Sequence, residues 1–154
     1  MARISTTIEI ERPVAEVFEY LTDLRNAKDW STEVVDVSYH GELAHGTTGS
    51  DTRTMGRKEL VMPWRVTTFD EPSRVTLSYE QPFPFDATFS FEPTDRGTRV
   101  TCVTDLHPRG WWRLLGPVMA WEGRKADRVQ FAKVKAILES ADRTAGTTHE
   151  RTAT

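Results

Sequence analysis

Residues 84–106 read PFDATFSFEPTDRGTRVTCVTDL, and apolar and polar side chains alternate along both halves of this stretch. A period of two is that of a half-buried β-strand. The centre of the stretch, residues 93–97, combines proline, threonine, aspartate and glycine, which favour a reversal of the chain. The stretch therefore predicts two long strands, residues 84–92 and 97–106, that pair antiparallel across a short turn.

The same period extends toward the N-terminus and predicts further strands. These candidate strands cover residues 4–11, 35–39, 50–57, 59–69 and 73–81. In the strand at 35–39, the alternation places Val35, Val37 and Tyr39 on one face. Short turns between long strands are typical of an antiparallel meander.

Helical patterns interrupt the strands at two places. After the first strand, Pro13 opens a helix, where its missing N–H costs nothing, and a second short helix is expected over residues 24–30. Beyond residue 110 the period becomes helical again, with a kink expected at residues 116–117. The apolar stripe predicted for this C-terminal helix is formed by Trp111, Leu115, Val118, Glu122, Ala126, Val129, Phe131, Val134 and Leu138.

An antiparallel sheet with helices on one face is an α+β architecture. Only the C-terminal helix is long enough to cover the apolar face of such a sheet, so the sheet is expected to curl around it. Residues 1–142 are expected to form one domain. Residues 143–154 contain no apolar side chain larger than alanine, and this tail is expected to be disordered.

Composition excludes several classes of protein. The net charge of −3 does not indicate a nucleic-acid partner, and no apolar run approaches the length of a transmembrane helix. The single cysteine and the spacing of the histidines indicate no metal site, and no nucleotide-binding loop is present, so no cofactor is expected. The N-terminus has no signal-peptide pattern, so we expect a cytoplasmic location.

The apolar residues are unusual in kind. Leu, Ile, Val and Phe together supply only 33 residues, whereas 15 residues of the chain are aromatic. The predicted core is therefore poor in aliphatic side chains and rich in rings.

Several short segments carry a resemblance to a known superfamily. They are residues 10–18 (IERPVAEVF), residues 21–23 with Trp30, residues 66–72, residues 97–101, and residues 138–139 at the end of the last helix. In this order and spacing they resemble the START-like (SRPBCC) superfamily over residues 3–140, and within it the polyketide cyclase/dehydrase group.

The resemblance implies a helix-grip fold. In this fold a curved seven-stranded antiparallel sheet wraps around a long C-terminal helix, and two short helices follow the first strand. A hydrophobic ligand cavity lies between the sheet and the long helix. Members include aromatase/cyclases, lipid and sterol carriers, and hormone receptors.

Strand parity suggests which side chains would line such a cavity, although a filled core would show the same period. Aromatic side chains and methionines dominate this predicted wall, as in many ligand pockets. The expected ligand-binding residues are Trp30, Arg53, Met62, Trp64, Tyr79, Phe85, Phe89, Phe91, Thr104, Trp111, Leu115, Met119 and Glu122.

Glu122 is a candidate catalytic residue together with Tyr79. It lies on the apolar stripe of the last helix, where a carboxylate needs a partner, and Arg53 or Tyr79 could supply one. A glutamate facing a tyrosine would suit proton transfer during cyclisation or dehydration. The alternative is that Glu122 lies at the edge of the stripe and pairs with Arg124 or Lys125.

The segment around Trp111 and Trp112 allows three interpretations. It could form a lid over the cavity, an exposed patch for a partner or membrane surface, or an ordinary packed turn. Residues 109–135 carry a net charge of +5, whereas residues 1–108 carry −7. Such a basic helix could approach anionic lipid or an acidic partner, or form a solvated face.

The leading functional hypothesis is the binding of a small hydrophobic, aromatic or polycyclic ligand by a carrier or sensor. The first alternative is a polyketide cyclase/dehydratase-type enzyme that uses Glu122 and Tyr79, with Arg53 as an anion anchor. The second is a partner-binding or membrane-surface module that uses the basic helix. The sequence leaves open whether any reaction is catalysed, and it does not indicate the oligomeric state.

Overall fold

The computed structural model describes residues 2–81, 83–108, 110, 114, 125 and 128–140. Its elements are β1 (Ala2–Ile10), α1 (Val14–Thr22), η1 (Leu24–Asn26), α2 (Ala27–Trp30), β2 (Val34–Tyr39), β3 (Thr48–Met55), β4 (Lys58–Asp70), β5 (Arg74–Tyr79), β6 (Phe85–Pro93) and β7 (Thr98–Leu106). Residues 128–140 are helical and belong to the C-terminal helix. The predicted kink at 116–117 and the predicted tail at 143–154 lie outside the described residues.

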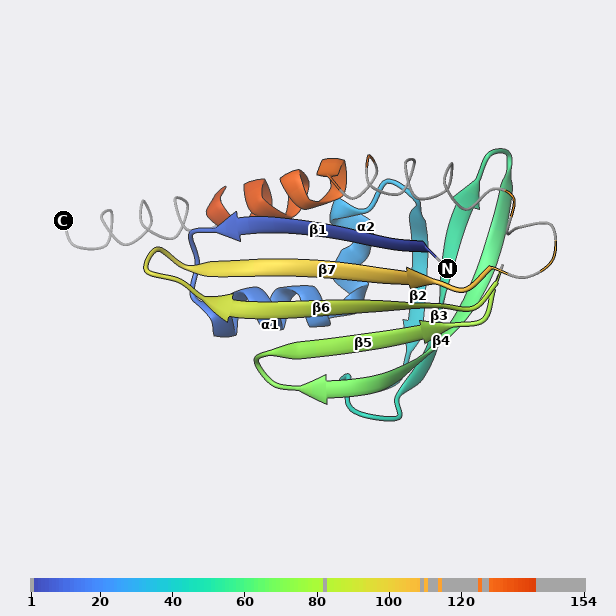
Figure 1. Cartoon of the computed structure of the whole chain (residues 1–154), viewed down its shortest axis with the longest axis horizontal. Helices are drawn as coiled ribbons and strands as arrows, with labels where there is room; N and C mark the ends of the chain where they lie inside the picture. The colour runs from blue at the N-terminus through green and yellow to red at the C-terminus, as the bar shows by residue number, and fades with distance from the viewer. Residues whose placement is uncertain are drawn as a thin grey trace.

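The seven strands form one antiparallel sheet in the order β1-β7-β6-β5-β4-β3-β2 (Figure 1). Strand β1 pairs with β7 over its whole length, with Ile4 opposite Thr104, so the first and last strands are neighbours. The predicted α+β class and the antiparallel hairpin of residues 84–106 are confirmed. The curved sheet and the C-terminal helix match the helix-grip fold that the resemblance implies.

Strand alternation and helix periodicity supply the apolar faces. In β1, Ile4 and Ile10 are buried while the residues between them alternate toward solvent. Helix α1 begins after Pro13 and buries Val17, Phe18 and Leu21. Among the described residues, no helix is both long and apolar enough to span a membrane.

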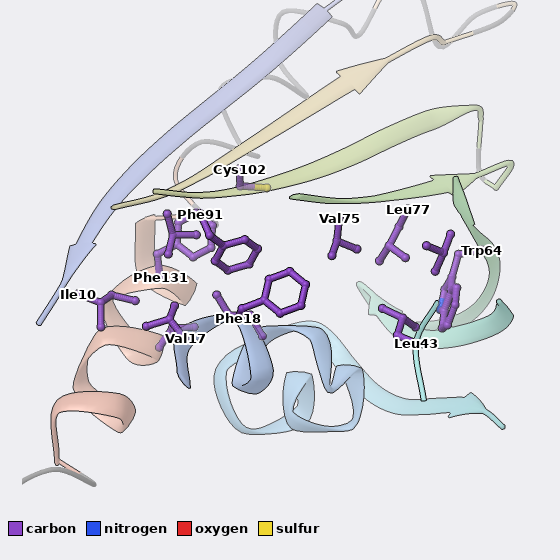
Figure 2. Close-up of a cluster of buried hydrophobic side chains, with 14 of the residues drawn as sticks. Ile10, Val17, Phe18, Leu43, Trp64, Val75, Leu77, Phe91, Cys102 and Phe131 are labelled. Carbon is purple, nitrogen blue, oxygen red and sulfur yellow. The ribbon is translucent and has the colours of Figure 1, made fainter. Parts of the chain in front are cut away.

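The core lies between the sheet and the helices on one of its faces (Figure 2). Phe18 of α1 packs edge-on against Phe91 of β6, with ring centroids 5.0 Å apart, and against Phe69 of β4 at 5.6 Å. From the C-terminal helix, Phe131 and Val134 enter the same cluster and are almost fully buried. Burial of a large apolar side chain contributes about 1.5–3 kcal/mol, so these rings attach both helices to the sheet.

Two of the sequence predictions are wrong in detail. Val35 does not share the inner face with Val37 and Tyr39, because an irregularity in the β2–β3 register between residues 34 and 36 leaves it 44% exposed. Val129 is 48% exposed. The predicted stripe members Phe131, Val134 and Leu138 are buried as expected and follow the helical period.

The turn between β6 and β7 packs closely against the chain that links β1 to α1. Thr98 is fully buried, and its hydroxyl donates a hydrogen bond of 2.8 Å to the carbonyl oxygen of Arg12. A Cβ atom at Gly97 would overlap the carbonyl oxygen of Ile10 and lie 2.7 Å from the Arg12 nitrogen. Only glycine therefore allows this approach of two backbone segments.

We expect Gly97→Ala to lower the free energy of unfolding by about 3 kcal/mol, because two backbone segments would have to separate. Gly56→Ala is the control: a Cβ there meets nothing within 4 Å, although φ is +65°. The control should cost only about 1 kcal/mol of backbone strain. Urea denaturation measures both values, and equal losses would contradict the packing argument.

Candidate functional site

A cavity of about 220 Å³ lies between the sheet and the helices. Its wall is formed by strands across the sheet, including the edge strands β1 and β2, by the short helices η1 and α2, and by the C-terminal helix. The described residues that line it are Ile4, Leu24, Ala27, Trp30, Ser31, Glu33, Val34, Asp51, Arg53, Leu77, Tyr79, Phe85, Ala87, Phe89, Cys102, Thr104, Gln130 and Phe131.

Aromatic rings form much of this wall. The rings of Tyr79 and Phe85 are stacked with centroids 4.5 Å apart and an angle of 8° between their planes. Phe89 of β6 meets Phe131 of the C-terminal helix edge-on at 6.4 Å. Such rings offer flat apolar surfaces to a ligand that itself contains rings.

A buried group of polar side chains lies at the same cavity, and we name Asp51, Arg53, Trp64 and Tyr79 the Asp51 cluster. Trp64 Nε1 donates to Asp51 Oδ1 at 2.9 Å. Tyr79 Oη and Arg53 Nη2 donate to Asp51 Oδ2 at 2.8 Å and 2.9 Å. Arg53 Nη2 also donates to Tyr79 Oη at 3.3 Å. The carboxylate therefore accepts hydrogen bonds from three side chains.

The register of the strands explains why these side chains meet. Asp51 and Arg53 are two residues apart on β3 and so point to the same face. Asp51 lies opposite Met62 of β4, and Trp64 is therefore its diagonal neighbour. Tyr79 of β5 lies directly opposite Trp64.

Gly49 makes room for the indole of Trp64. The two residues are opposite each other in the β3–β4 register. A Cβ at Gly49 would lie 2.5 Å from Trp64 Cζ2 and 2.6 Å from the carbonyl oxygen of Ser38. The absence of a side chain at Gly49 thus lets the indole lie where its N–H reaches Asp51.

Burial and charge set the ionisation of the cluster. Asp51 is 5% exposed and Tyr79 is 3% exposed. Burial raises the pKa of the Tyr79 hydroxyl above its ordinary value; the positive charge of Arg53 opposes this rise, and the negative charge of Asp51 adds to it. Burial by itself would lower the pKa of Arg53, but its interactions with Tyr79 and Asp51 outweigh this effect and raise the pKa. Tyr79 therefore stays protonated and Arg53 stays charged at neutral pH.

Arg53 is the member of the cluster that is most open to solvent, with 26% of its side chain exposed. Its Nη1 lies 4.0 Å from Glu33 Oε2. Its Nε is buried and has no hydrogen-bond partner among the described residues, and the same holds for Trp30 Nε1. Two donors of cavity-lining residues are thus unpaired in the described part of the chain.

The predicted ligand-binding residues fall into three groups. Six of them line the cavity: Trp30, Arg53, Tyr79, Phe85, Phe89 and Thr104. Three lie in the packed core and do not line it, namely Met62, Trp64 and Phe91. Four lie outside the described residues: Trp111, Leu115, Met119 and Glu122.

Packing against neighbouring rings explains two of these three core positions. Phe91 is covered by Phe18 of α1, and the ring of Trp64 packs edge-on against Tyr39 at 5.6 Å.

The sequence argument for burying Glu122 placed it on one stripe with Val129. The exposure of Val129 removes that support.

Sequence reasoning missed Asp51, which holds the cluster together. Arg53 and Tyr79 were proposed as partners of a buried carboxylate. Both do donate hydrogen bonds to a buried carboxylate, and it belongs to Asp51 of β3. A signal was present, because the strand period already places Asp51 on the same face as Arg53. Glu33 and Gln130, which also line the cavity, were missed as well, and no motif singles them out.

Comparison with known proteins supports the fold. The family described as polyketide cyclase / dehydrase and lipid transport matches residues 1–139. No curated protein matches the chain.

Solved structures of similar fold come from several bacteria. Protein NE0264 from Nitrosomonas europaea is 15% identical, with a TM-score of 0.73 over 91% of this chain and 96% of that one. TTHA0849 from Thermus thermophilus is 17% identical, with a TM-score of 0.73 over 90% and 98%. Ms6760 from Mycobacterium smegmatis is 20% identical, with a TM-score of 0.70 over 90% and 92%. At these identities the likeness shows the fold alone.

We expect Asp51→Ala to destabilise the protein by about 3 kcal/mol, because it leaves the largely covered charge of Arg53 with only the more distant Glu33 and leaves Trp64 Nε1 without its acceptor. Asp36→Ala is the matched control, since Asp36 is exposed on β2. The control should change the free energy of unfolding by less than about 0.5 kcal/mol. Similar losses for both variants in urea denaturation would show that the cluster does not stabilise the fold.

The raised pKa of Tyr79 predicts how stability changes at alkaline pH. Below the ordinary tyrosine value of 10.0, the folded and unfolded states both keep this proton. Above it the unfolded chain releases the proton and the folded chain does not, so stability falls as pH rises, by up to about 1.4 kcal/mol per pH unit.

Tyr79→Phe should therefore flatten the dependence of the unfolding free energy on pH between about pH 10 and 12, although the variant is less stable at neutral pH. Denaturation series at several pH values measure the two slopes. Tyr20 and Tyr39, whose pKa values are also raised, remain in both proteins and act as an internal reference. Identical slopes would contradict the assignment.

Proposed function

The chain belongs to the polyketide cyclase / dehydrase and lipid transport family, and we propose that it binds a small, largely apolar, ring-containing ligand as a carrier or sensor. The observation that carries this proposal is the cavity of about 220 Å³, which is walled by rings and has polar groups grouped around Arg53. Apolar pockets with a few placed polar groups are typical ligand sites.

The size of the cavity limits the ligand. An apolar cavity of about 150 Å³ in another protein holds benzene, which sets a scale for one ring. A cavity of about 220 Å³ therefore fits a compound of one or two rings better than a four-ring compound. Tyr79, Phe85 and Phe89 would stack on or pack against such a ligand.

The catalytic alternative has less support from the geometry. The Tyr79 hydroxyl donates a hydrogen bond to Asp51, so its proton is not directed at a substrate. The Asp51 carboxylate already accepts hydrogen bonds from Trp64 and Arg53 and is almost fully buried. The cluster is better suited to hold Arg53 in place than to transfer protons. The second proposed catalytic group, Glu122, lies outside the described residues.

The surface-binding alternative rests on Trp111, Trp112 and the basic segment that follows them. Both tryptophans lie outside the described residues. Within the described helix, Lys135 Nζ is held by the carbonyl oxygen of Glu9 at 2.7 Å and by Glu139 Oε1 at 3.2 Å. This lysine therefore stabilises the contact between helix and sheet, which gives the membrane or partner hypothesis no support.

Ligand binding in the cavity can be tested with three two-ring probes: naphthalene, 2-acetonaphthone and 2-naphthoate. We expect at least one of them to raise the melting temperature of the wild-type protein, because a ligand that binds only the folded state stabilises it. Ala87→Leu should abolish that rise, since the larger side chain would occupy part of the cavity wall.

Ala136→Leu makes the same exchange at a position of the C-terminal helix that does not line the cavity, and it should leave the rise unchanged. Isothermal titration then gives the affinities of the wild type and of both variants. If none of the three probes stabilises the wild type, or if Ala87→Leu binds as tightly as Ala136→Leu, the proposal is wrong.

A further inference from the structure

Resting on the proposed ligand binding, we infer that the cavity selects ligands whose polar group is a neutral hydrogen-bond acceptor, such as a ketone, ester or amide, over carboxylates of the same size. This selectivity for one class of ligand follows from the charges and the donors that surround Arg53.

Among the described residues that line the cavity, acidic side chains outnumber basic ones. Arg53 is the only basic residue among the described residues that line it, and two acidic residues, Asp51 and Glu33, line it as well. Asp51 Oδ2 lies 2.9 Å from Arg53 Nη2, and Glu33 Oε2 lies 4.0 Å from Nη1. With one guanidinium between two carboxylates, a third carboxylate on a ligand would meet net repulsion.

The Asp51 carboxylate, which balances the charge of Arg53, cannot rotate away to make room for an anionic ligand. Trp64 Nε1 holds one carboxylate oxygen, and Tyr79 Oη holds the other together with Arg53. Rotation of the carboxylate would break these bonds inside a region that water hardly reaches. Arg53 is therefore neutralised by the protein itself, whether a ligand is bound or not.

Among the described lining residues, the buried side-chain polar atoms that lack a partner are both donors. Arg53 Nε and Trp30 Nε1 have no acceptor among the described residues. A neutral carbonyl oxygen of a ligand can accept hydrogen bonds from donors of this kind, and it brings no charge into the apolar cavity. A carboxylate would lose its hydration as well, which is far more costly than for a neutral oxygen.

The sharpest test compares 2-acetonaphthone with 2-naphthoate, which share one ring system and differ in the acetyl and carboxylate groups. At pH 7.5 the carboxylate is ionised. We expect isothermal titration to show that the ketone binds the wild-type protein at least about tenfold more tightly. Repulsion of roughly 1.4 kcal/mol corresponds to that factor.

Glu33→Gln removes one of the two negative charges near Arg53, and Glu33 is half exposed, so the fold should tolerate the exchange. We expect this variant to bind 2-naphthoate about 3- to 10-fold more tightly than the wild type does, and the affinity for 2-acetonaphthone to change by a smaller factor because the ketone carries no charge. Glu59→Gln, at an exposed position of β4, is the control and should change neither affinity.

The outcomes separate this inference from the proposed function. If naphthoate binds the wild type as tightly as the ketone or more tightly, the selectivity is overturned, while ligand binding stands. If Glu33→Gln and Glu59→Gln have the same effect on naphthoate, repulsion by Glu33 is overturned. If no probe binds, the proposed function itself fails, and with it the premise of the selectivity.

Discussion

The Asp51 carboxylate connects three neighbouring strands through hydrogen bonds on the inner face of the sheet. It lies on β3, beside Arg53 of the same strand, and accepts hydrogen bonds from Trp64 of β4 and Tyr79 of β5 as well. A buried carboxylate is costly unless it is paired and hydrogen-bonded, and here both oxygens are satisfied. The position of Arg53, the orientation of Tyr79 and the polar character of the cavity all depend on this one group.

The inner face of the sheet is thus divided into two parts. Around α1, rings such as those of Phe18 and Phe91 pack edge to face and leave a filled core. Between the short helix α2, strands β5 and β6, and the C-terminal helix, rings surround a cavity instead. The same kind of side chain serves both purposes, since an aromatic ring can fill space or form a flat wall. The shortage of aliphatic residues fits a protein that leaves part of its interior open to a ligand.

Much of the fold could be predicted because it rests on local periodicity. The parity of residues 75–79 and 100–106 placed their apolar side chains on the correct face. The failures have local causes: an irregular register beside Val35, and a buried stripe in residues 128–140 that includes Phe131 and excludes Val129. Neither is visible in the spacing of apolar residues, because each depends on how an element packs against its neighbour.

Alternation and helical spacing act over a few residues, so local patterns suffice to predict the order of the elements, the antiparallel meander and the aromatic character of the inner face. The same strand period places Asp51 and Arg53 on one face of β3. That Trp64 and Tyr79 meet them there follows from the fold, since the partner across a sheet depends on register and on the room left by Gly49. The division of the inner face into core and cavity likewise follows from how the helices lie on the sheet, which residue spacing does not encode.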